Sequence, residues 1–277
     1  MRARRVAPSA MQRRSQVLAG MALAGLLATL AGCAGQPAAT AGRDVVTASD
    51  ETESAKRARV RLELASAYFA QGQTTTALDE VKQALVISPN LPEGYNLRGL
   101  VYAAMGESTL ADESFRRALQ LAPRDADTLH NYGWYQCQQG RYAEAETLFA
   151  QALALPQYRD APRTLLTQGV CYARSGKLPQ AEQVLVRAFE FEPGNPAIAV
   201  NLSEVLYRRG DYERARFYVR RVNAQADRSS AQTLWLAMRI EHRTGDVQQL
   251  NDLALQLRNR FPQSRELALY ERGQFDE

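Results

Sequence analysis

The body of the chain is built from apolar and polar positions that recur every 34 residues. The clearest units follow the pattern Gly-x4-Ala-x6-Ala-x4-Pro, in which x is any residue. We expect each unit to form a helix, a turn at the glycine and an antiparallel second helix that proline ends, since proline cannot continue a helix. The first two copies contain Gly72, Ala77, Ala84 and Pro89, then Gly106, Ala111, Ala118 and Pro123.

Four further copies follow with increasing drift. The third and fourth keep the glycine and both alanines, and an insertion of two residues near Tyr158 separates them. The fifth and sixth keep Gly210 and Gly245 but lose alanines. The unit resembles the tetratricopeptide repeat (TPR). The resemblance implies an all-α fold, a right-handed superhelical solenoid of six repeats over residues 57–263.

Small residues mark the places where the helices of such an array cross closely. Gly133 in a first helix and Ala145 in the following second helix are examples. We expect large side chains such as Phe149 to fill the spaces between the helices. Residues 264–277 are expected to form a short C-terminal capping helix, with Ser264 at its N-cap, and a tail that frays from Gly273.

The amino terminus has the pattern of a bacterial lipoprotein signal. Residues 1–32 combine five arginines with an apolar stretch that ends in Leu-Ala-Gly before Cys33. This stretch is short for a membrane span and suits a cleaved signal peptide. Proteins with such a motif are acylated on the cysteine, and Ala34 rather than Asp after it favours the outer membrane. We therefore expect a protein lipid-anchored at Cys33 on the periplasmic face, with a flexible tether over residues 33–56.

Charge and composition exclude several classes of function. The net charge is +4, but residues 1–32 contain all of the excess, because the remainder holds 29 basic and 30 acidic residues. A nucleic-acid binder is therefore not expected. Phosphate loops and hydrolase motifs are lacking, and only two histidines occur, so we expect no enzyme, no small-molecule substrate, no metal and no cofactor.

Cys137 and Cys171 lie in the first helices of neighbouring repeats. They occupy different positions within the repeat, the twelfth and the tenth, which favours two unpaired and partly buried thiols. A periplasmic disulfide is the alternative.

TPR arrays bind other proteins in a groove lined mainly by their first helices. Apolar and polar residues alternate at the groove positions of the first three repeats, and the apolar ones taken as candidate partner-binding residues are Leu62, Phe69, Leu100 and Trp134. Tyr207 and Trp235 occupy groove positions further along, among several arginines. For each tryptophan, packing between repeats is an equal alternative to exposure.

Longer stretches carry a more specific resemblance. They are HNYGWYQCQQGRYAEAE (130–146), NLSEVLYRRGDYERARFYVRR (201–221), TLWLAMRIEHRTGD (233–246) and RFPQSRE (260–266). With the lipobox cysteine and six repeats, they resemble the type IV pilus biogenesis and stability lipoproteins (the PilF/PilW family), which are secretin pilotins. The resemblance implies that the protein binds secretin subunits and promotes their outer-membrane localisation and multimerisation, as twitching motility and adhesion require. The alternative is a TPR lipoprotein adaptor of another periplasmic or outer-membrane assembly machine.

Overall fold

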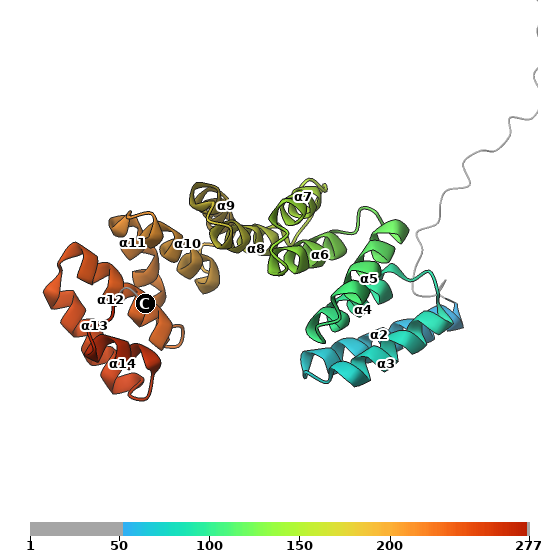
Figure 1. The fold of residues 1–277 in the computed structure, drawn as a ribbon, viewed down its shortest axis with the longest axis horizontal. Helices are drawn as coiled ribbons and strands as arrows, with labels where there is room; N and C mark the ends of the chain where they lie inside the picture. The colour runs from blue at the N-terminus through green and yellow to red at the C-terminus, as the bar shows by residue number, and fades with distance from the viewer. Residues whose placement is uncertain (1–51, 276–277) are drawn as a thin grey trace, which may run out of the picture. The chain divides into compact units, whose positions relative to one another are not determined.

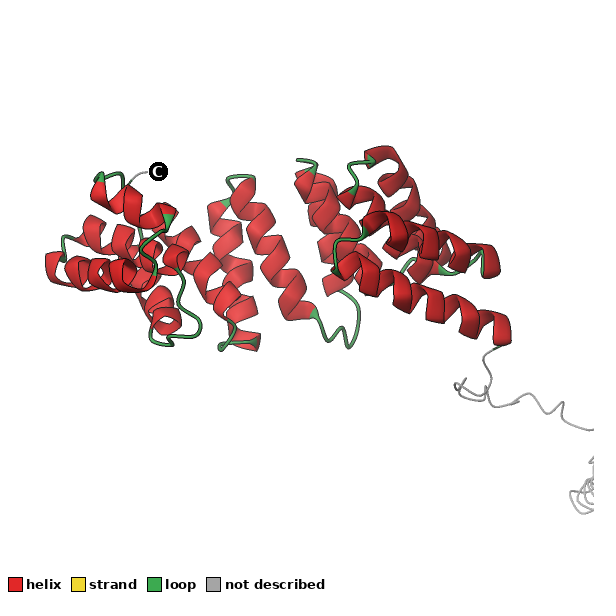
Figure 2. Cartoon of the chain, turned by 90° about the horizontal axis from the view of Figure 1, so that it is seen from below, coloured by secondary structure: helices red, strands yellow, loops and turns green. Residues whose placement is uncertain are grey.

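A computed structural model describes residues 52–275 of the chain, and every regular element within that range is a helix (Figure 2). Twelve of its helices form six antiparallel pairs, and a short helix follows the last pair (Figure 1). The structure therefore confirms an all-α superhelical TPR solenoid. Each helix pair is called a repeat below, numbered 1 to 6 along the chain.

First helices and second helices line opposite sides of the array, and neighbouring first helices contact one another. In Figure 1, α6, α8 and α10 lie on the inner side of the curve and α7, α9 and α11 on the outer side. The first helices are α2 (Glu53–Ala70), α4 (Pro92–Ala104), α6 (Ala126–Gln138), α8 (Ala161–Arg174), α10 (Pro196–Arg208) and α12 (Ala231–Thr244). The second helices are α3 (Thr74–Ile87), α5 (Ser108–Leu121), α7 (Tyr142–Leu153), α9 (Leu178–Phe191), α11 (Tyr212–Asn223) and α13 (Val247–Arg260).

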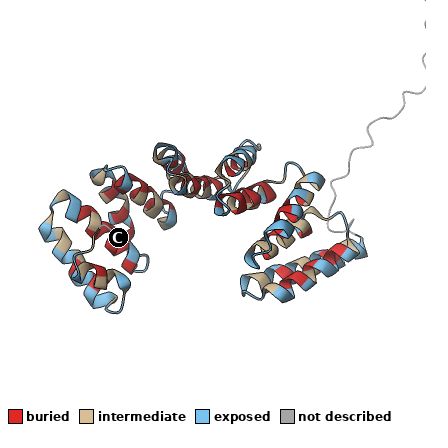
Figure 3. Cartoon of the chain, in the orientation of Figure 1, coloured by how far each residue is buried: buried red, intermediate tan, exposed pale blue. Residues whose placement is uncertain are grey.

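In repeats 2 to 4 the two helices approach closely because a glycine of the first faces a large side chain of the second. A Cβ atom added at Gly133 would lie 2.9 Å from the ring of Phe149, and one added at Gly169 would lie 2.5 Å from Leu185. Phe149 and Leu185 are fully buried. The core is thus a row of small clusters between helices (Figure 3), as the spacing of small and large residues predicts.

The turn within each repeat needs a left-handed residue. Gly140, which follows α6, has a φ of 73°, where a side chain would be strained. The glycines at the same point of the other five repeats have φ between 76° and 81°. The expected turn chemistry is therefore confirmed.

The C-terminal helix α14 (Arg265–Glu271) caps the array as expected. The Ser264 hydroxyl accepts a hydrogen bond from the backbone N–H of Leu267, and Leu267 and Leu269 are buried against repeat 6. For residues 273–275 the expectation of fraying from Gly273 is wrong, because Phe275 stacks on Trp235 at a centroid distance of 5.2 Å; residues 276 and 277 lie outside the described residues. Aromatic burial offsets the entropy of ordering these residues.

A disulfide joins Cys137 of α6 to Cys171 of α8, with their Cα atoms 5.9 Å apart. The expectation of two unpaired thiols is therefore wrong. That expectation rested on the different repeat positions of the two cysteines. On adjacent first helices, however, side chains at the same repeat position point in the same direction. Two side chains that face each other across the helices must therefore come from different repeat positions. The different positions thus favour the bond.

Several features expected from the sequence fall within residues 1–51, which lie outside the described residues. They include the signal peptide, the acylated Cys33 and most of the tether. The expectation that the tether extends to residue 56 is wrong, because α2 begins at Glu53 and the Thr52 side chain caps it by accepting a hydrogen bond from the backbone N–H of Ala55. Within residues 52–275, no helix combines the length and the apolar character that crossing a membrane requires.

Candidate functional site

The exposed surface of α2, α4, α6, α8, α10 and α12 is called the inner face below. Contacts between successive first helices make it one continuous surface along the six repeats. All four residues predicted to bind a partner, Leu62, Phe69, Leu100 and Trp134, lie on these helices and are partly buried. Each side chain therefore exposes part of its surface to a partner, and each also packs within the fold.

Leu62 and Phe69 lie on α2 and take part in two different clusters. Leu62 packs against the cluster formed by Ala65, Val81 and Leu85. Phe69 packs against the cluster that contains Leu78. The two side chains thus stabilise repeat 1 and its junction with repeat 2, in addition to any role in binding.

Leu100 and Trp134 belong to two further clusters. Leu100 of α4 packs beside Phe115 and Tyr132. Trp134 of α6 packs beside the disulfide and Phe149. The four predicted residues therefore do not form a single apolar patch, and they follow one another along three repeats.

Two exposed apolar residues of α2 were not among the sequence candidates. Val60 and Leu64 are 44% and 45% exposed. They hold the same repeat positions as Ile198 and Leu202 of repeat 5, which are fully buried. Those positions face the preceding repeat, and no described repeat precedes α2. A position-by-position comparison of repeat 1 with the later repeats would have identified this apolar end from the sequence.

Tyr207 and Trp235 occupy predicted groove positions, and the structure buries both, so the alternative of packing between repeats holds for Trp235. Tyr207 is 8% exposed beneath Arg239, whose guanidinium lies 4.4 Å from the centre of its ring. Trp235 is 6% exposed and packs against the C-terminal cap. Of the two tryptophans, only Trp134 has appreciable exposed surface.

Polar side chains cross the inner face from repeat 2 to repeat 4. The Asn131 amide donates to Asn96 over 3.2 Å, and Arg163 donates to the Asn131 oxygen over 3.5 Å. Further along, Arg239 of α12 lies 3.7 Å from the Glu204 carboxylate of α10. At the groove positions (second, fifth, ninth, twelfth and thirteenth of each repeat), arginine occurs once in the first three repeats, as Arg59, and five times in the last three, as Arg163, Arg174, Arg208, Arg239 and Arg243.

Arginine also ends two successive first helices. Arg174 of α8 extends over the indole of Trp134 at 5.6 Å, and Arg208 of α10 donates to the backbone carbonyl of Ala173 over 3.0 Å. Both side chains are exposed. Each therefore contacts the first helix of the preceding repeat through an uncharged group.

His130 is part of the packing between repeats 3 and 4. It is 4% exposed, and its Nδ1 lies 2.8 Å from the Thr164 hydroxyl. Burial, reinforced by the positive charge of Arg163, lowers the pKa of His130 to about 4. The imidazole is therefore neutral at pH 7. Its neighbour along the helix face, Cys137, is oxidised, so this pair does not provide an acid–base and thiolate couple.

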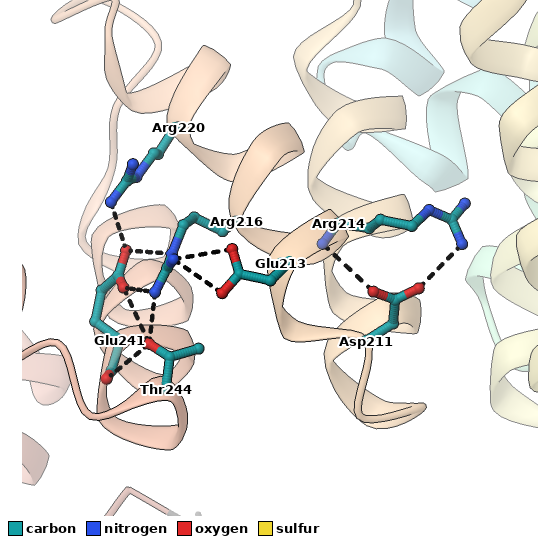
Figure 4. Close-up of polar contacts among 7 residues, drawn as sticks. All are labelled: Asp211, Glu213, Arg214, Arg216, Arg220, Glu241 and Thr244. Atoms are coloured by element: carbon teal, nitrogen blue, oxygen red, sulfur yellow. Dashed lines mark hydrogen bonds and ion pairs between the residues drawn. The ribbon is translucent and has the colours of Figure 1, made fainter.

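Charged groups on the outer side hold repeats 5 and 6 together (Figure 4). The Glu241 carboxylate of α12 is buried and accepts hydrogen bonds from Arg216 and Arg220 of α11, each at 3.1 Å. The Thr244 hydroxyl completes the group. A buried carboxylate needs such partners, so this network sets the position of α12 against α11.

Comparison with known proteins places the repeats in a known class. Family models described as tetratricopeptide or TPR repeats match residues 65–106, 91–157 and 172–235. The type IV pilus assembly protein PilF of Pseudomonas aeruginosa is 29% identical over 205 residues, which cover 74% of this chain and 81% of PilF.

Two solved structures extend the likeness to three dimensions. The crystal structure of PilW, described as a widely conserved type IV pilus biogenesis factor, superposes with a TM-score of 0.72 at 27% identity, covering 77% of this chain and 98% of PilW. A structure of P. aeruginosa PilF gives a TM-score of 0.70 at 26% identity, covering 80% of this chain and all of that chain. The chain is therefore a tetratricopeptide repeat protein that is homologous to the type IV pilus assembly protein PilF.

Proposed function

We propose that this protein is a type IV pilus assembly factor that binds secretin subunits and promotes their multimerisation in the outer membrane. The observation that carries the proposal is the homology to PilF across the repeats, together with the close likeness of the fold to PilW. The repeats thus supply the binding surface, and no catalytic step is invoked.

The inner face suits such a task. A secretin subunit has apolar surface and unpaired strand edges before it oligomerises, and both promote aggregation. Half-buried apolar side chains, among them Phe69 and Trp134, line the inner face of the first three repeats. We propose that Leu62, Phe69, Leu100 and Trp134 contact the secretin subunit and shield its apolar surface until assembly.

Lipid attachment would deliver the bound subunit to its membrane. We propose that Cys33 carries the acyl chains and that the residues between Cys33 and α2, which begins at Glu53, act as a tether at the periplasmic face of the outer membrane. Two or more acyl chains give stable anchoring, whereas a single chain binds only reversibly.

The proposal is tested by co-purification of the secretin with the tagged full-length protein from detergent-solubilised membranes. We expect the wild-type chain to retain the secretin, and Phe69→Glu to lose it together with secretin multimers and twitching, because a carboxylate is costly to bury in an apolar interface. The matched control is Phe217→Glu, which places the same charge on an exposed phenylalanine of α11 on the outer side. Since Phe69 is half-buried, thermal melting of both variants must show that they remain folded. A folded Phe69→Glu variant with normal multimers would exclude this contact, and failure of the wild-type chain to retain secretin would contradict the proposed function.

A further inference from the structure

The end of each first helix differs between the two halves of the array. At the thirteenth repeat position, the first three repeats have Ala70, Ala104 and Gln138. At the same position, the last three have arginine. These arginines are Arg174, Arg208 and Arg243. Because neighbouring first helices contact one another, the three arginines follow each other along the inner face of repeats 4 to 6.

Arg174 and Arg208 contact uncharged groups, and the Glu204 carboxylate, four residues before Arg208 on α10, pairs with Arg239 instead. Across residues 52–275, neither guanidinium forms an ion pair, and their partners are the Trp134 ring and the Ala173 carbonyl. Arginines on the outer side differ, since Arg214 pairs with Glu182 and Arg216 with Glu241. Neutral partners orient the inner arginines but leave their positive charge available.

We propose that the inner face of repeats 4 to 6 binds an extended acidic segment of the partner protein through Arg174 and Arg208. This inference rests on the proposed function, since it specifies the chemistry of the partner. A guanidinium presents two parallel N–H donors that fit a carboxylate, and such charge-assisted hydrogen bonds are stronger than neutral ones. Arg163 and Arg239 lie on the same face, but nearby carboxylates partly balance their charges: Asp127 lies within electrostatic range of Arg163, and Glu204 lies 3.7 Å from Arg239.

The spacing of the helices indicates how the acidic residues are arranged. Packed helices lie about 8–10 Å apart. Three residues of a polyproline II segment rise about 9 Å and return to the same side of the chain. An acidic residue at every third position of an extended segment would therefore meet an arginine from each successive repeat.

Arginine in the last turn of a helix has a simpler explanation, because a cation there stabilises the helix dipole. That effect accounts for the position of Arg174 and Arg208 in their helices. It predicts no binding of an acidic peptide. Binding measurements on folded variants therefore separate the two explanations.

The test measures fluorescence anisotropy of a labelled peptide with the full-length protein in a neutral detergent at low salt. The probe has glutamate at every third position of an extended, proline-containing sequence of about twelve residues, and its counterpart has lysine in place of glutamate. We expect the acidic peptide to bind, with an affinity that falls as salt is added, and the lysine peptide not to bind. The double variant Arg174→Gln/Arg208→Gln should weaken binding about tenfold or more.

The matched control is Arg124→Gln/Arg187→Gln, which removes the same charge from exposed residues outside the first helices. It should bind the acidic peptide within about twofold of the wild-type chain, since distant exposed charges act weakly. Equal binding by both double variants, or no binding by the wild-type chain, would overturn the proposal.

Two further measurements identify the natural ligand. The amount of secretin that co-purifies should decrease in Arg174→Gln/Arg208→Gln and should be unchanged in the control variant. If vesicles of anionic phospholipid bind in an Arg174- and Arg208-dependent manner and secretin retention is unchanged, the proposed protein partner is wrong. Failure of the wild-type chain to retain secretin would count against the proposed function alone, because peptide binding is measured without secretin.

Discussion

At the scale of single residues, small side chains determine how closely the helices of a repeat pack. The environment of Gly133 has no room for a Cβ atom, whereas a Cβ atom at Gly194 would meet nothing within 4 Å. Neither glycine has a positive φ. The two positions therefore separate the effect of crowding from that of losing a glycine.

We expect Gly133→Leu to destabilise the protein by about 1–3 kcal/mol, because overpacking forces the Phe149 ring and the backbone to move. Gly194→Leu should change the stability by less than about 0.5 kcal/mol, as exposed substitutions usually do. Thermal and urea unfolding of the two variants provide the measurement. Equal melting temperatures would contradict the close crossing of α6 and α7.

His130 makes stability depend on pH. Burial lowers its pKa from 6.5 to about 4, so the unfolded chain binds a proton more readily than the folded chain. The contribution of the neutral imidazole to stability is complete above about pH 6.5 and is lost as the pH falls toward 4, by about 3 kcal/mol at most. Urea unfolding between pH 7 and pH 4 should show this loss, and His130→Asn should reduce it. An unchanged pH profile in that variant would assign the loss to other groups.

At the scale of elements, the junctions between repeats are held in different ways. A disulfide joins α6 to α8, an aromatic and hydrogen-bonded cluster surrounds His130 at the same junction, and the carboxylate of Glu241 joins α11 to α12. Apolar packing occurs at every junction. These polar contacts make the packing of neighbouring helices more specific, because a hydrogen-bond donor and its acceptor must meet at a defined distance and angle.

The disulfide between Cys137 and Cys171 closes a loop of 34 residues. In the chain-entropy model, such a cross-link stabilises the fold by about 3–4 kcal/mol, mainly by restricting the unfolded chain. We expect Cys137→Ala/Cys171→Ala to melt at a lower temperature, and reductant to lower the melting temperature of the wild-type chain only. Digestion without reductant should release the two cysteine peptides as one linked mass. Recovery of both as free thiols from oxidised protein would contradict the bond.

At the scale of the whole molecule, the array combines two surfaces of different chemistry. Apolar side chains of α2, including Val60 and Leu64, are exposed at one end, and arginines predominate on the inner face of the last three repeats. A partner that occupies both would need an apolar part and an acidic extended part. Binding along several repeats also explains how a shallow surface can select one protein, since each contact need only be weak.

We expect Cys33→Ser to leave the repeats folded and to release the protein from the outer membrane, because anchoring needs acyl chains and helix packing does not. The variant should fractionate with the periplasm or the inner membrane, and secretin multimers should decrease there. Membrane fractionation and circular dichroism measure the two effects. A variant that remained in outer membranes with normal multimers would contradict lipid-directed delivery.

The repeat architecture could be predicted from the sequence because it depends on local and periodic features. A left-handed glycine, a proline after the second helix and small residues at fixed spacing have the same consequences in each copy that contains them. The cap at Ser264 followed from the same local chemistry, since its hydroxyl bonds a backbone N–H three residues away. These features depend only on residues that are close in the sequence, and not on contacts between distant parts of the fold.

Contacts between repeats depended on the tertiary structure. The pairing of Cys137 with Cys171, the burial of Trp235 and the exposure of Leu64 follow from which sides of neighbouring helices meet. A repeat position points the same way in each copy, but its neighbour differs between the middle and the end of the array. The sequence also does not show which arginines are paired with a carboxylate. The structure places Glu241 beside Arg216, whereas Arg208 contacts only a backbone carbonyl.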